Sequence, residues 1–488
     1  MKHNKLKLAV AGAVLALTSQ AATAGIIIPA GDWTVDLGGN VNTFYSNTDF
    51  TGNLSTQTIT AGTAANSVQV VTASIGATGL ASITSVSNTA NAATTRTLGA
   101  RAAGAATTKN ANQISTGLLP TAIGIGAKTR QNDLDVAIQT TFFVGSNASS
   151  AGTGAYNTQV NGLNSLNIRQ AYLSFGDKSW GTIKAGRDLG TFGSDAILSD
   201  MTLLGVGTGA GGAGNSTLGR IGSGYLYADW IGQMQYQSPN FGGFQVQGAI
   251  REPLASVANS KLGYEGKATF DFNSNDVSGR IWLGGIHQEV STTAVAAGDA
   301  STVSNIVTTG FSAATATGNQ VTTTTTTAGS AAVAAVKKDA RAVDVGAKIN
   351  FAGLGLVGYY YDGKNIGGSS MIAPGTSASG LNYDTSADDR DVRGGYVQAT
   401  YKLPVGTTLG ASYGISKIKE TAGDRALNTA ALTGDFENES YIVGAYHPIT
   451  KHLNLVGEYT NTEYQNIANF KGYDGKAKTF ALGAILFF

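Results

Sequence analysis

Alternation of apolar and polar residues at every second position is the feature of this chain that most constrains its fold. Within 133–145, for example, Leu134 and Val136 alternate with Asp133 and Asp135. Such a segment is expected to form a strand with one apolar face and one polar face. The pattern recurs along the chain in segments of about 9–13 residues, the length that a tilted strand needs to cross a membrane.

Sixteen segments of this kind are expected to be strands. They are 33–45, 120–129, 133–145, 165–176, 181–187, 230–237, 243–251, 262–273, 278–288, 340–351, 354–362, 393–403, 407–418, 440–447, 452–464 and 476–488. Long connections alternate with short ones: 46–119 is long, 130–132 is short and 146–164 is long. Bacterial barrels have short periplasmic turns and longer external loops, and an even strand number leaves both termini on the periplasmic side. The sequence therefore predicts an all-β fold, a transmembrane antiparallel β-barrel of 16 strands.

Two insertions of low complexity interrupt this pattern. They are 46–119, rich in Ala, Thr and Ser, and 289–339, which includes a run of six threonines at 322–327. Neither has the fixed repeat of a solenoid, and both are poor in the large apolar residues that a folded unit needs. We predict that both are long external loops.

The start of the chain predicts export. A positively charged beginning precedes a ten-residue apolar run at 8–17, and small residues ending at Ala24 fit a cleavage site before Gly25. The run is half the length of a spanning helix, which needs about 20 apolar residues. The prediction is a signal peptide over 1–24 and an outer-membrane β-barrel over 25–488.

Composition limits the classes of protein that remain. Without the three signal-peptide lysines the chain has 29 basic and 31 acidic residues, a net charge of −2, so nucleic acid is not an expected partner. There is no cysteine, and Gly 66 against Pro 7 with 13% charged residues is unusual for a soluble enzyme. No convincing Ser/His/Asp arrangement, metal-binding pattern or phosphate loop is found, so neither an enzyme nor a cofactor is expected. A glycine-rich barrel and a secreted fibre or adhesin remain.

Several segments match a known family in sequence. They are Arg169-Gln170-Ala171-Tyr172-Leu173, Gly181-Thr182-Ile183-Lys184-Ala185-Gly186-Arg187, Gln235-Tyr236-Gln237-Ser238-Pro239-Asn240-Phe241-Gly242-Gly243-Phe244 and Gln398-Ala399-Thr400-Tyr401-Lys402-Leu403. They resemble the trimeric Gram-negative general porins of the neisserial and β-proteobacterial type. The resemblance implies a homotrimer of 16-stranded barrels, each with an inward-folded third loop that constricts it. Segment 188–229 lies where that loop is expected, although its glycine-rich stretch 205–214 departs from the family.

Charges at the narrowest ring of such a barrel select solutes. Strict alternation from Ile183 and Ala185 points Arg187 at lipid, where an arginine costs about 2–4 kcal/mol. We therefore expect Arg187 to turn inward through a bulge or at the strand end, and the resemblance implies that a basic residue here belongs to the constriction. The alternative is an arginine that reaches the outer rim of the membrane.

Further candidates for the constriction lie on the wall and on the predicted inner loop, although each could equally be an ordinary solvated charge. They are Lys184, Arg251, Lys267 and Lys348 on the wall, and Asp195, Asp200 and Arg220 on the loop. Wall acids offset the basic residues, so the sequence predicts only a weak preference for anions.

The final strand is expected to direct membrane insertion. Phe480, Leu482, Ala484, Leu486 and Phe488 alternate up to a terminal aromatic residue, which resembles the assembly signal read by the barrel-assembly machinery. The opposite face is apolar where the family has polar residues. Either that face packs under a neighbouring strand or loop, or the wall is drier there than in a typical porin.

The function predicted from these observations is passive diffusion of small hydrophilic solutes and ions through a water-filled channel in the outer-membrane lipid. A substrate-specific porin, or a surface adhesin or structural barrel that acts through its long loops, remains an alternative.

Overall fold

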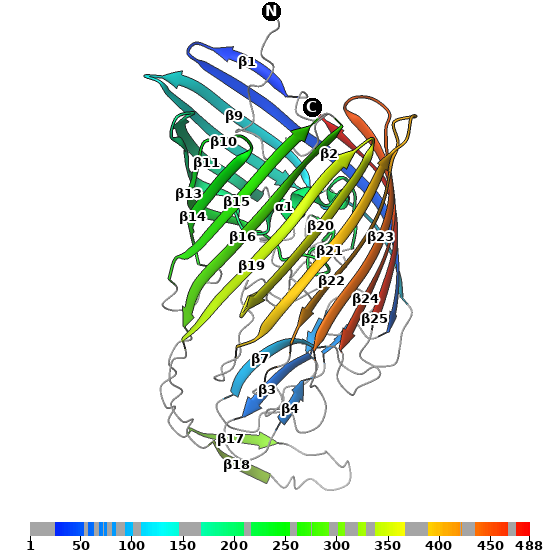
Figure 1. Ribbon diagram of the computed structural model, residues 1–488. Helices are drawn as coiled ribbons and strands as arrows, with labels where there is room; N and C mark the ends of the chain where they lie inside the picture. Colours follow the sequence, from blue (N-terminus) through cyan, green and yellow to red (C-terminus); the bar gives the residue numbers. More distant parts are fainter. Residues whose placement is uncertain are drawn as a thin grey trace, which may run out of the picture.

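Sixteen antiparallel strands form a closed wall (Figure 1). The computed structural model describes residues 25–52, 57–62, 68–71, 73–75, 81–83, 93–100, 109–145, 167–208, 216–253, 261–274, 276–291, 301–307, 321–327, 337–366, 389–419, 421, 435–466 and 475–488. The wall strands within these ranges are β2 (Trp33–Gly52), β9 (Thr121–Gln131), β10 (Leu134–Val144), β11 (Asn167–Asp177), β12 (Gly181–Leu189), β13 (Trp230–Gln237), β14 (Phe244–Arg251), β15 (Gly263–Ser274), β16 (Val277–Ser291), β19 (Lys337–Phe351), β20 (Leu354–Lys364), β21 (Asp391–Lys402), β22 (Thr408–Ile418), β23 (Phe436–Pro448), β24 (Leu453–Asn466) and β25 (Gly475–Phe487).

The two ends of this series pair with each other. β2 pairs with β9 from Thr34 to Asn40 and with β25 from Asn40 to Gly52, so the sheet closes on itself. Backbone hydrogen bonds between Gly39 and Phe488, of 2.9 and 3.0 Å, extend this closure to the last residue. The predicted 16-stranded barrel is confirmed.

Each of the sixteen predicted segments overlaps one wall strand. β13 has the predicted bounds, whereas β2, β19 and β23 extend further toward the long connections than alternation indicated. Their extra residues are paired with neighbouring strands, as in the pairing of Thr51 with Lys476. Pairing partners, rather than apolar residues, therefore determine these strand ends.

The structure also contains strands that the sequence did not predict. β1 (Ile26–Ala30) pairs with the beginning of β2, and β8 (Lys109–Ser115) pairs with β2 from Phe44 to Phe50. Five more lie in 46–119, namely β3 (Gln57–Gly62), β4 (Val68–Val71), β5 (Ala73–Ile75), β6 (Ala81–Ile83) and β7 (Ala93–Ala100). Two lie in 289–339, namely β17 (Ser301–Val307) and β18 (Val321–Thr327). Their Ala- and Thr-rich sequences give no strong apolar alternation, which is why the prediction of plain loops missed them.

The strand ends that lead into short and into long connections lie at opposite ends of the barrel. The short turns, β1 and the C-terminus are at the top of Figure 1, and the strand ends that lead into the long connections are at the bottom. The turn between β9 and β10 has Asn132 and Asp133 at φ of 48° and 63°, a conformation that matches the twist of paired strands. The predicted sorting of the loops is therefore seen in the fold.

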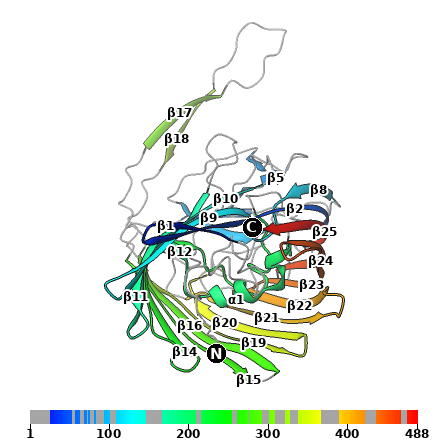
Figure 2. The same ribbon diagram turned by 90° about the horizontal axis from the view of Figure 1, so that it is seen from above.

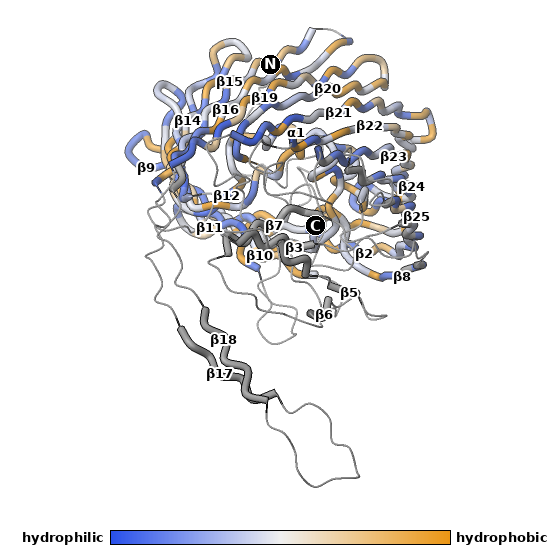
Figure 3. Tube along the Cα trace, turned by 90° about the horizontal axis from the view of Figure 1, so that it is seen from below, coloured by the Kyte–Doolittle hydropathy of each residue, from blue (hydrophilic) through white to orange (hydrophobic). Residues whose placement is uncertain are grey.

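The outer surface of the wall is apolar. Ile125, Leu283 and Val397 are 46%, 59% and 60% exposed, and they alternate with residues that face the interior. Figure 3 shows this alternation of hydrophobic and hydrophilic positions along the wall. Among the residues that the structure describes, no helix is long and apolar enough to cross a membrane.

The interior contains the segment between β12 and β13. Its helix α1 (Ser194–Ser199) lies inside the ring of strands (Figure 2), followed by the 3-10 helix η2 (Met201–Leu204). The predicted inward fold of the third loop is confirmed for residues 190–208 and 216–229, which we call the inner loop, whereas residues 188 and 189 belong to β12. Residues 1–24 lie outside the described residues, so the signal peptide and its cleavage between Ala24 and Gly25 stay predictions.

Candidate functional site

The beginning of the inner loop is bound by a buried ion pair on the wall. Glu265 on β15 accepts hydrogen bonds from the backbone N–H groups of Thr191 and Phe192, at 2.5 and 3.0 Å. The same carboxylate pairs with Arg251 on β14 at 2.6 Å, and the two side chains are 0% and 3% exposed. Arg251 was predicted to line the pore, but it lies in a buried contact that positions the loop.

Helix α1 brings an acid to a group of basic wall residues. Asp195 lies 2.6 Å from Lys267 on β15 and 3.0 Å from Arg280 on β16. Burial raises the pKa of the Asp195 carboxyl, but Lys267 and Arg280 outweigh this effect, so its pKa lies below the usual value. Arg280 also pairs with Asp271 at 2.6 Å. The predicted Asp195 and Lys267 are therefore brought together, with Arg280 as an unforeseen third member.

The middle of the inner loop is organised around Asp200. Its carboxylate accepts from the N–H of Thr202 at 2.9 Å, which caps η2, and from the hydroxyl of Tyr225 at 2.7 Å. Gln398 on β21 accepts from the N–H of Met201 at 2.8 Å and donates to the carbonyl of Ser199 at 3.0 Å. Asp200 is 4% exposed, so it supports the loop rather than facing open water.

The return of the inner loop is held by Arg220. Its guanidinium donates to the hydroxyls of Ser412 on β22 and Ser440 on β23, and it is fully buried. Burial lowers the pKa of Arg220 from its usual value, but an arginine remains protonated in proteins. Arg220 therefore attaches the inner loop directly to the wall, and both it and Asp200 are buried rather than exposed in an open channel.

Glu458 on β24 binds the far turn of the inner loop. It accepts from the backbone N–H groups of Val206 and Gly207 at 2.7 and 2.8 Å, and from the hydroxyl of Tyr446 at 2.6 Å. Its side chain is buried. The sequence did not single out this residue, although an acid at an inward position between Val456 and Thr460 is a signal that could have found it.

A second inward segment meets the inner loop from the opposite side. Gly117 donates through its N–H to Asn42 on β2, at 2.9 Å, and Leu118 donates to the carbonyl of Gly205 at 2.8 Å. Leu118 and Leu119 are 6% and 7% exposed. The prediction that 46–119 is external throughout is therefore wrong at its end, because these leucines are covered by the loop within the barrel.

Two predicted lysines lie on the inner face of the wall. Lys184 pairs with Asp188 and lies 5.3 Å from the ring centre of Tyr172. Asp188 also accepts from Gln170 at 2.8 Å. Lys348 lines a cavity on the short-turn side of the inner loop. For both lysines the inward position agrees with alternation, and their effect on solutes stays a prediction.

Arg187 does not turn inward. It pairs in register with Gly232, two residues after Ala185, which lies opposite the exposed Met234, and no register shift interrupts the pairing of β12 with β13. Its side chain is 45% exposed and lies 3.9 Å from Glu252. The predicted bulge is absent from the pairing of β12 with β13, and Glu252, which lies close to Gly232, partly compensates the charge of Arg187 on the outer face.

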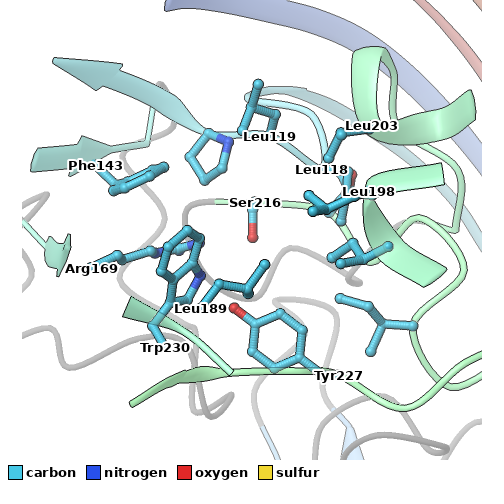
Figure 4. Close-up of a pocket in the computed structure, with 14 residues that line it drawn as sticks. Leu118, Leu119, Phe143, Arg169, Leu189, Leu198, Leu203, Ser216, Tyr227 and Trp230 are labelled. Carbon is cyan, nitrogen blue, oxygen red and sulfur yellow. The ribbon is translucent and has the colours of Figure 1, made fainter. Parts of the chain in front are cut away.

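The inner loop and 116–120 enclose a small cavity against β10–β13, which we call the neck (Figure 4). Its volume is about 40 Å³. It is lined by Leu118, Leu119, Pro120, Phe143, Arg169, Leu189, Ile197, Leu198, Leu203, Ser216, Thr217, Ile221, Tyr227 and Trp230.

A larger cavity of about 320 Å³, here the turn-side cavity, lies between the inner loop and the short turns. Lys348, Lys402 and Lys451 are among its lining residues. Leu198 and Leu203 line both cavities and therefore separate them.

Arg169 is the residue at the neck that the sequence interpretation missed. A register shift between Thr141 and Phe142 on β10 lies opposite the start of β11, and both Arg169 and Gln170 are 5% exposed there. A bulge places two successive side chains on one face, which alternation cannot foresee. The only signal was that Arg169 begins the first of the segments that resemble the family.

Comparison with known proteins shows which solved structures have a similar fold. No family model matches the sequence, and no curated protein matches it. Among solved structures, the anion-selective porin from Comamonas acidovorans is similar at 12% identity and a TM-score of 0.52, over 93% of this chain and 100% of that chain. The outer membrane channel DcaP of Acinetobacter baumannii is similar at 15% identity and a TM-score of 0.51, over 95% and 100% of the two chains.

The chain has the fold of an outer-membrane porin. At such low identity the likeness concerns the fold alone, so the conduction of solutes has to be argued from this chain's own residues. In the part of the chain that the structure describes, no group of three or more His, Cys, Asp or Glu side chains could hold a metal ion.

Proposed function

We propose that the chain is an outer-membrane porin, a water-filled channel for the passive diffusion of small hydrophilic solutes and ions. The observation that carries this proposal is the closed 16-stranded wall with a loop held inside it. A barrel of this size encloses a lumen rather than a packed core. An inner loop that is hydrogen-bonded to the wall narrows that lumen without needing any chemistry of its own.

The membrane location follows from the two faces of the wall. Large apolar side chains are exposed on the outer face, including Ile138, Leu283 and Val345 at 52%, 59% and 46%. An outward apolar band is what holds such barrels in lipid. The alternating last strand, Phe480 to Phe488, supports insertion by the barrel-assembly machinery, with its outward Phe480 and Leu482 51% and 56% exposed.

Assembly and selectivity are the finer parts of the proposal. The matches at 169–173 and 235–244 support membership of the neisserial and β-proteobacterial type, and with it a homotrimer. Lys348, Lys402 and Lys451 at the turn-side cavity support a weak preference for anions, because charges that line a narrow passage act on ions through poorly screened fields.

Planar-bilayer recording tests the proposal. Purified protein should add ohmic current in steps of three equal sublevels, and reversal potentials in a KCl gradient should show a modest preference for chloride. Replacing all three lysines by glutamine should remove that preference and leave the step size similar. A protein that inserts into bilayers without current would contradict the channel, and single-level steps would contradict the trimer.

A further inference from the structure

The turn-side cavity has an excess of positive charge. Three lysines from separate elements line it, namely Lys348 on β19, Lys402 at the end of β21 and Lys451 in the turn between β23 and β24. Within the described part of the chain, the amine of none of these lysines forms a hydrogen bond or an ion pair. Elsewhere on the wall a basic residue meets an acid, as Lys267 meets Asp195. The three amines are therefore left to act on a solute that enters the cavity.

The nearby acids already have other partners. Asp200 is the only acid among the described residues of the lining, and it is 4% exposed. Its two carboxylate oxygens accept hydrogen bonds from groups of the inner loop. Asp195 acts electrostatically on Lys348 from outside the lining, but it pairs with two other basic residues. A cleft lined by charges of one sign raises the local concentration of counter-ions, so the turn-side cavity should concentrate anions.

The cavity is large enough for an organic solute and is open to water. Lys402 and Lys451 are exposed, as is Asn350 in the same lining. Both lysines lie at the short-turn end of the barrel, at the top of Figure 1. The volume of about 320 Å³ is near the lower end of the range for small-molecule sites, about 300–1,000 Å³. It holds roughly twenty waters, since each needs about 10–15 Å³ of such space.

The lining also has an apolar part. Leu204 belongs to it from the inner loop, and Val357 and Phe487 belong to it from β20 and β25. An inorganic anion can use only the amines and the neutral polar groups of such a site. An organic acid also removes hydrocarbon surface from water. The combination of apolar side chains with a few charged groups therefore favours an organic anion.

Three amines favour a solute with more than one negative charge. A monovalent anion neutralises one lysine and leaves the other two to repel each other, whereas a solute with two or three carboxylates contacts several amines at once. A lysine amine has three N–H donors on a flexible stem, so it adapts to carboxylates at different positions. Hydrogen bonds between charged groups are stronger than neutral ones.

We propose that the turn-side cavity is a binding site for small organic polyanions, solutes that carry two or three carboxylates on a short hydrocarbon frame. This proposal rests on the proposed channel function, which brings such solutes from outside to the short-turn side of the inner loop. The carboxylates contact the three lysines, and the hydrocarbon frame lies against Leu204 and Phe487.

Isothermal titration calorimetry of the full chain in detergent tests the site without requiring conduction. Tricarballylate, glutarate and valerate share one main chain and carry three, two and one carboxylates, all of them ionised at about pH 8. The affinity should fall by about fivefold for each carboxylate removed, the upper value for a solvated ion pair. Sulfate, a dianion without a hydrocarbon frame, should bind more weakly than glutarate.

Variants locate the binding. The triple variant Lys348→Gln/Lys402→Gln/Lys451→Gln should bind tricarballylate about a hundredfold more weakly and should bind all three acids with similar affinity. Lys402→Gln and Lys451→Gln alone should each weaken binding by about fivefold, and both positions are exposed, so these variants serve even where the triple variant does not fold. Lys178→Gln is the matched control, because Lys178 is exposed in the short turn between β11 and β12 but does not line the cavity. It should leave the affinity unchanged.

The outcomes distinguish this proposal from the function on which it rests. Equal affinities of the wild type for the three acids, or an equal loss of affinity in Lys178→Gln and Lys451→Gln, would overturn the site even in a protein that conducts KCl in bilayers. Sulfate that binds as tightly as glutarate would overturn the preference for an organic frame. Binding in the expected order by a protein that gives no bilayer current would support the site and contradict the channel.

Discussion

Removal of Glu458 should detach the far turn of the inner loop from the wall without unfolding the barrel. Two loop N–H groups, of Val206 and Gly207, donate to this carboxylate at 2.7 and 2.8 Å. Hydrogen bonds to a charged group contribute about 1.5–3 kcal/mol each, so Glu458→Ala should weaken the attachment by about 3–6 kcal/mol. The detached state should then become at least about a hundredfold more populated.

Single-channel recording measures this effect. Glu458→Ala should produce frequent current fluctuations as the loop moves, and Glu458→Gln, which keeps neutral hydrogen bonds, should lie between this variant and the wild type. Glu463→Ala on the same strand is the control, because Glu463 pairs with Lys476 at 2.7 Å near the surface, and such pairs contribute about 0–1 kcal/mol. The temperature at which the barrel unfolds in detergent should stay the same, since the pairing of β24 with its neighbours is retained.

A crosslink provides the decisive comparison. The hydroxyls of Thr208 on the loop and Thr462 on β24 are 3.0 Å apart, and the chain has no cysteine of its own. Adding Thr208→Cys/Thr462→Cys to Glu458→Ala should quiet the current under oxidising conditions, and a reductant should restore the fluctuations. A Glu458→Ala channel as quiet as the Glu463→Ala channel would refute the reasoning.

Three further predictions test other parts of the structure. Arg187→Gln should leave the reversal potential unchanged, because Arg187 lies on the outer face. Arg280→Gln, on the inner face, should shift the reversal potential. A shift caused by Arg187→Gln would contradict the assigned orientation of Arg187. Glu265→Ala should lower the stability by about 3–5 kcal/mol in detergent unfolding, since it leaves Arg251 buried and unpaired, and Arg251→Met in the same chain should recover most of that loss. Phe488→Ala should reduce the amount of folded, heat-modifiable protein in the outer-membrane fraction at equal synthesis, and equal amounts would count against an assembly role.

Alternation could predict the wall because lipid and lumen impose opposite demands on successive residues. β13 (Trp230–Gln237) has its predicted bounds, and its exposed Met234 and Tyr236 alternate with buried Gln233 and Gln235. The same reasoning could not predict β8 (Lys109–Ser115), whose partner on β2 is some 60 residues away. Its small polar side chains contain no signal that distinguishes a paired strand from a loop.

The sequence could predict where the residues of the candidate site lie, but not which residues they contact. Alternation along the strands correctly placed Lys184, Arg251 and Lys267 on the inner face. However, Arg251 contacts an acid of the neighbouring strand, and Lys267 contacts an acid of the inner loop. A local pattern contains no information on which distant carboxylate a wall residue meets. For Arg187 the prediction failed because the neighbouring strand was left out. The free-energy cost of an arginine that faces lipid was judged from β12 alone. Gly232 on β13 has no side chain and so leaves room for Glu252 to approach Arg187.

The apolar inner face of the last strand has the same origin as the neck. Ile485 and Phe487 are 1% and 7% exposed, and both belong to the buried cluster that includes Leu203 and Val206 of the inner loop. Of the two explanations left open by the sequence, packing under a neighbouring segment is therefore the one observed. Ile485 belongs to the same buried cluster as residues of the inner loop, whereas Phe487 also lines the turn-side cavity. A loop that packs against an apolar wall on one side must itself be rich in apolar residues. Those that are not used against β25, such as Leu198 and Ile221, then line the neck, so the apolar lining of this cavity follows from how the loop is attached.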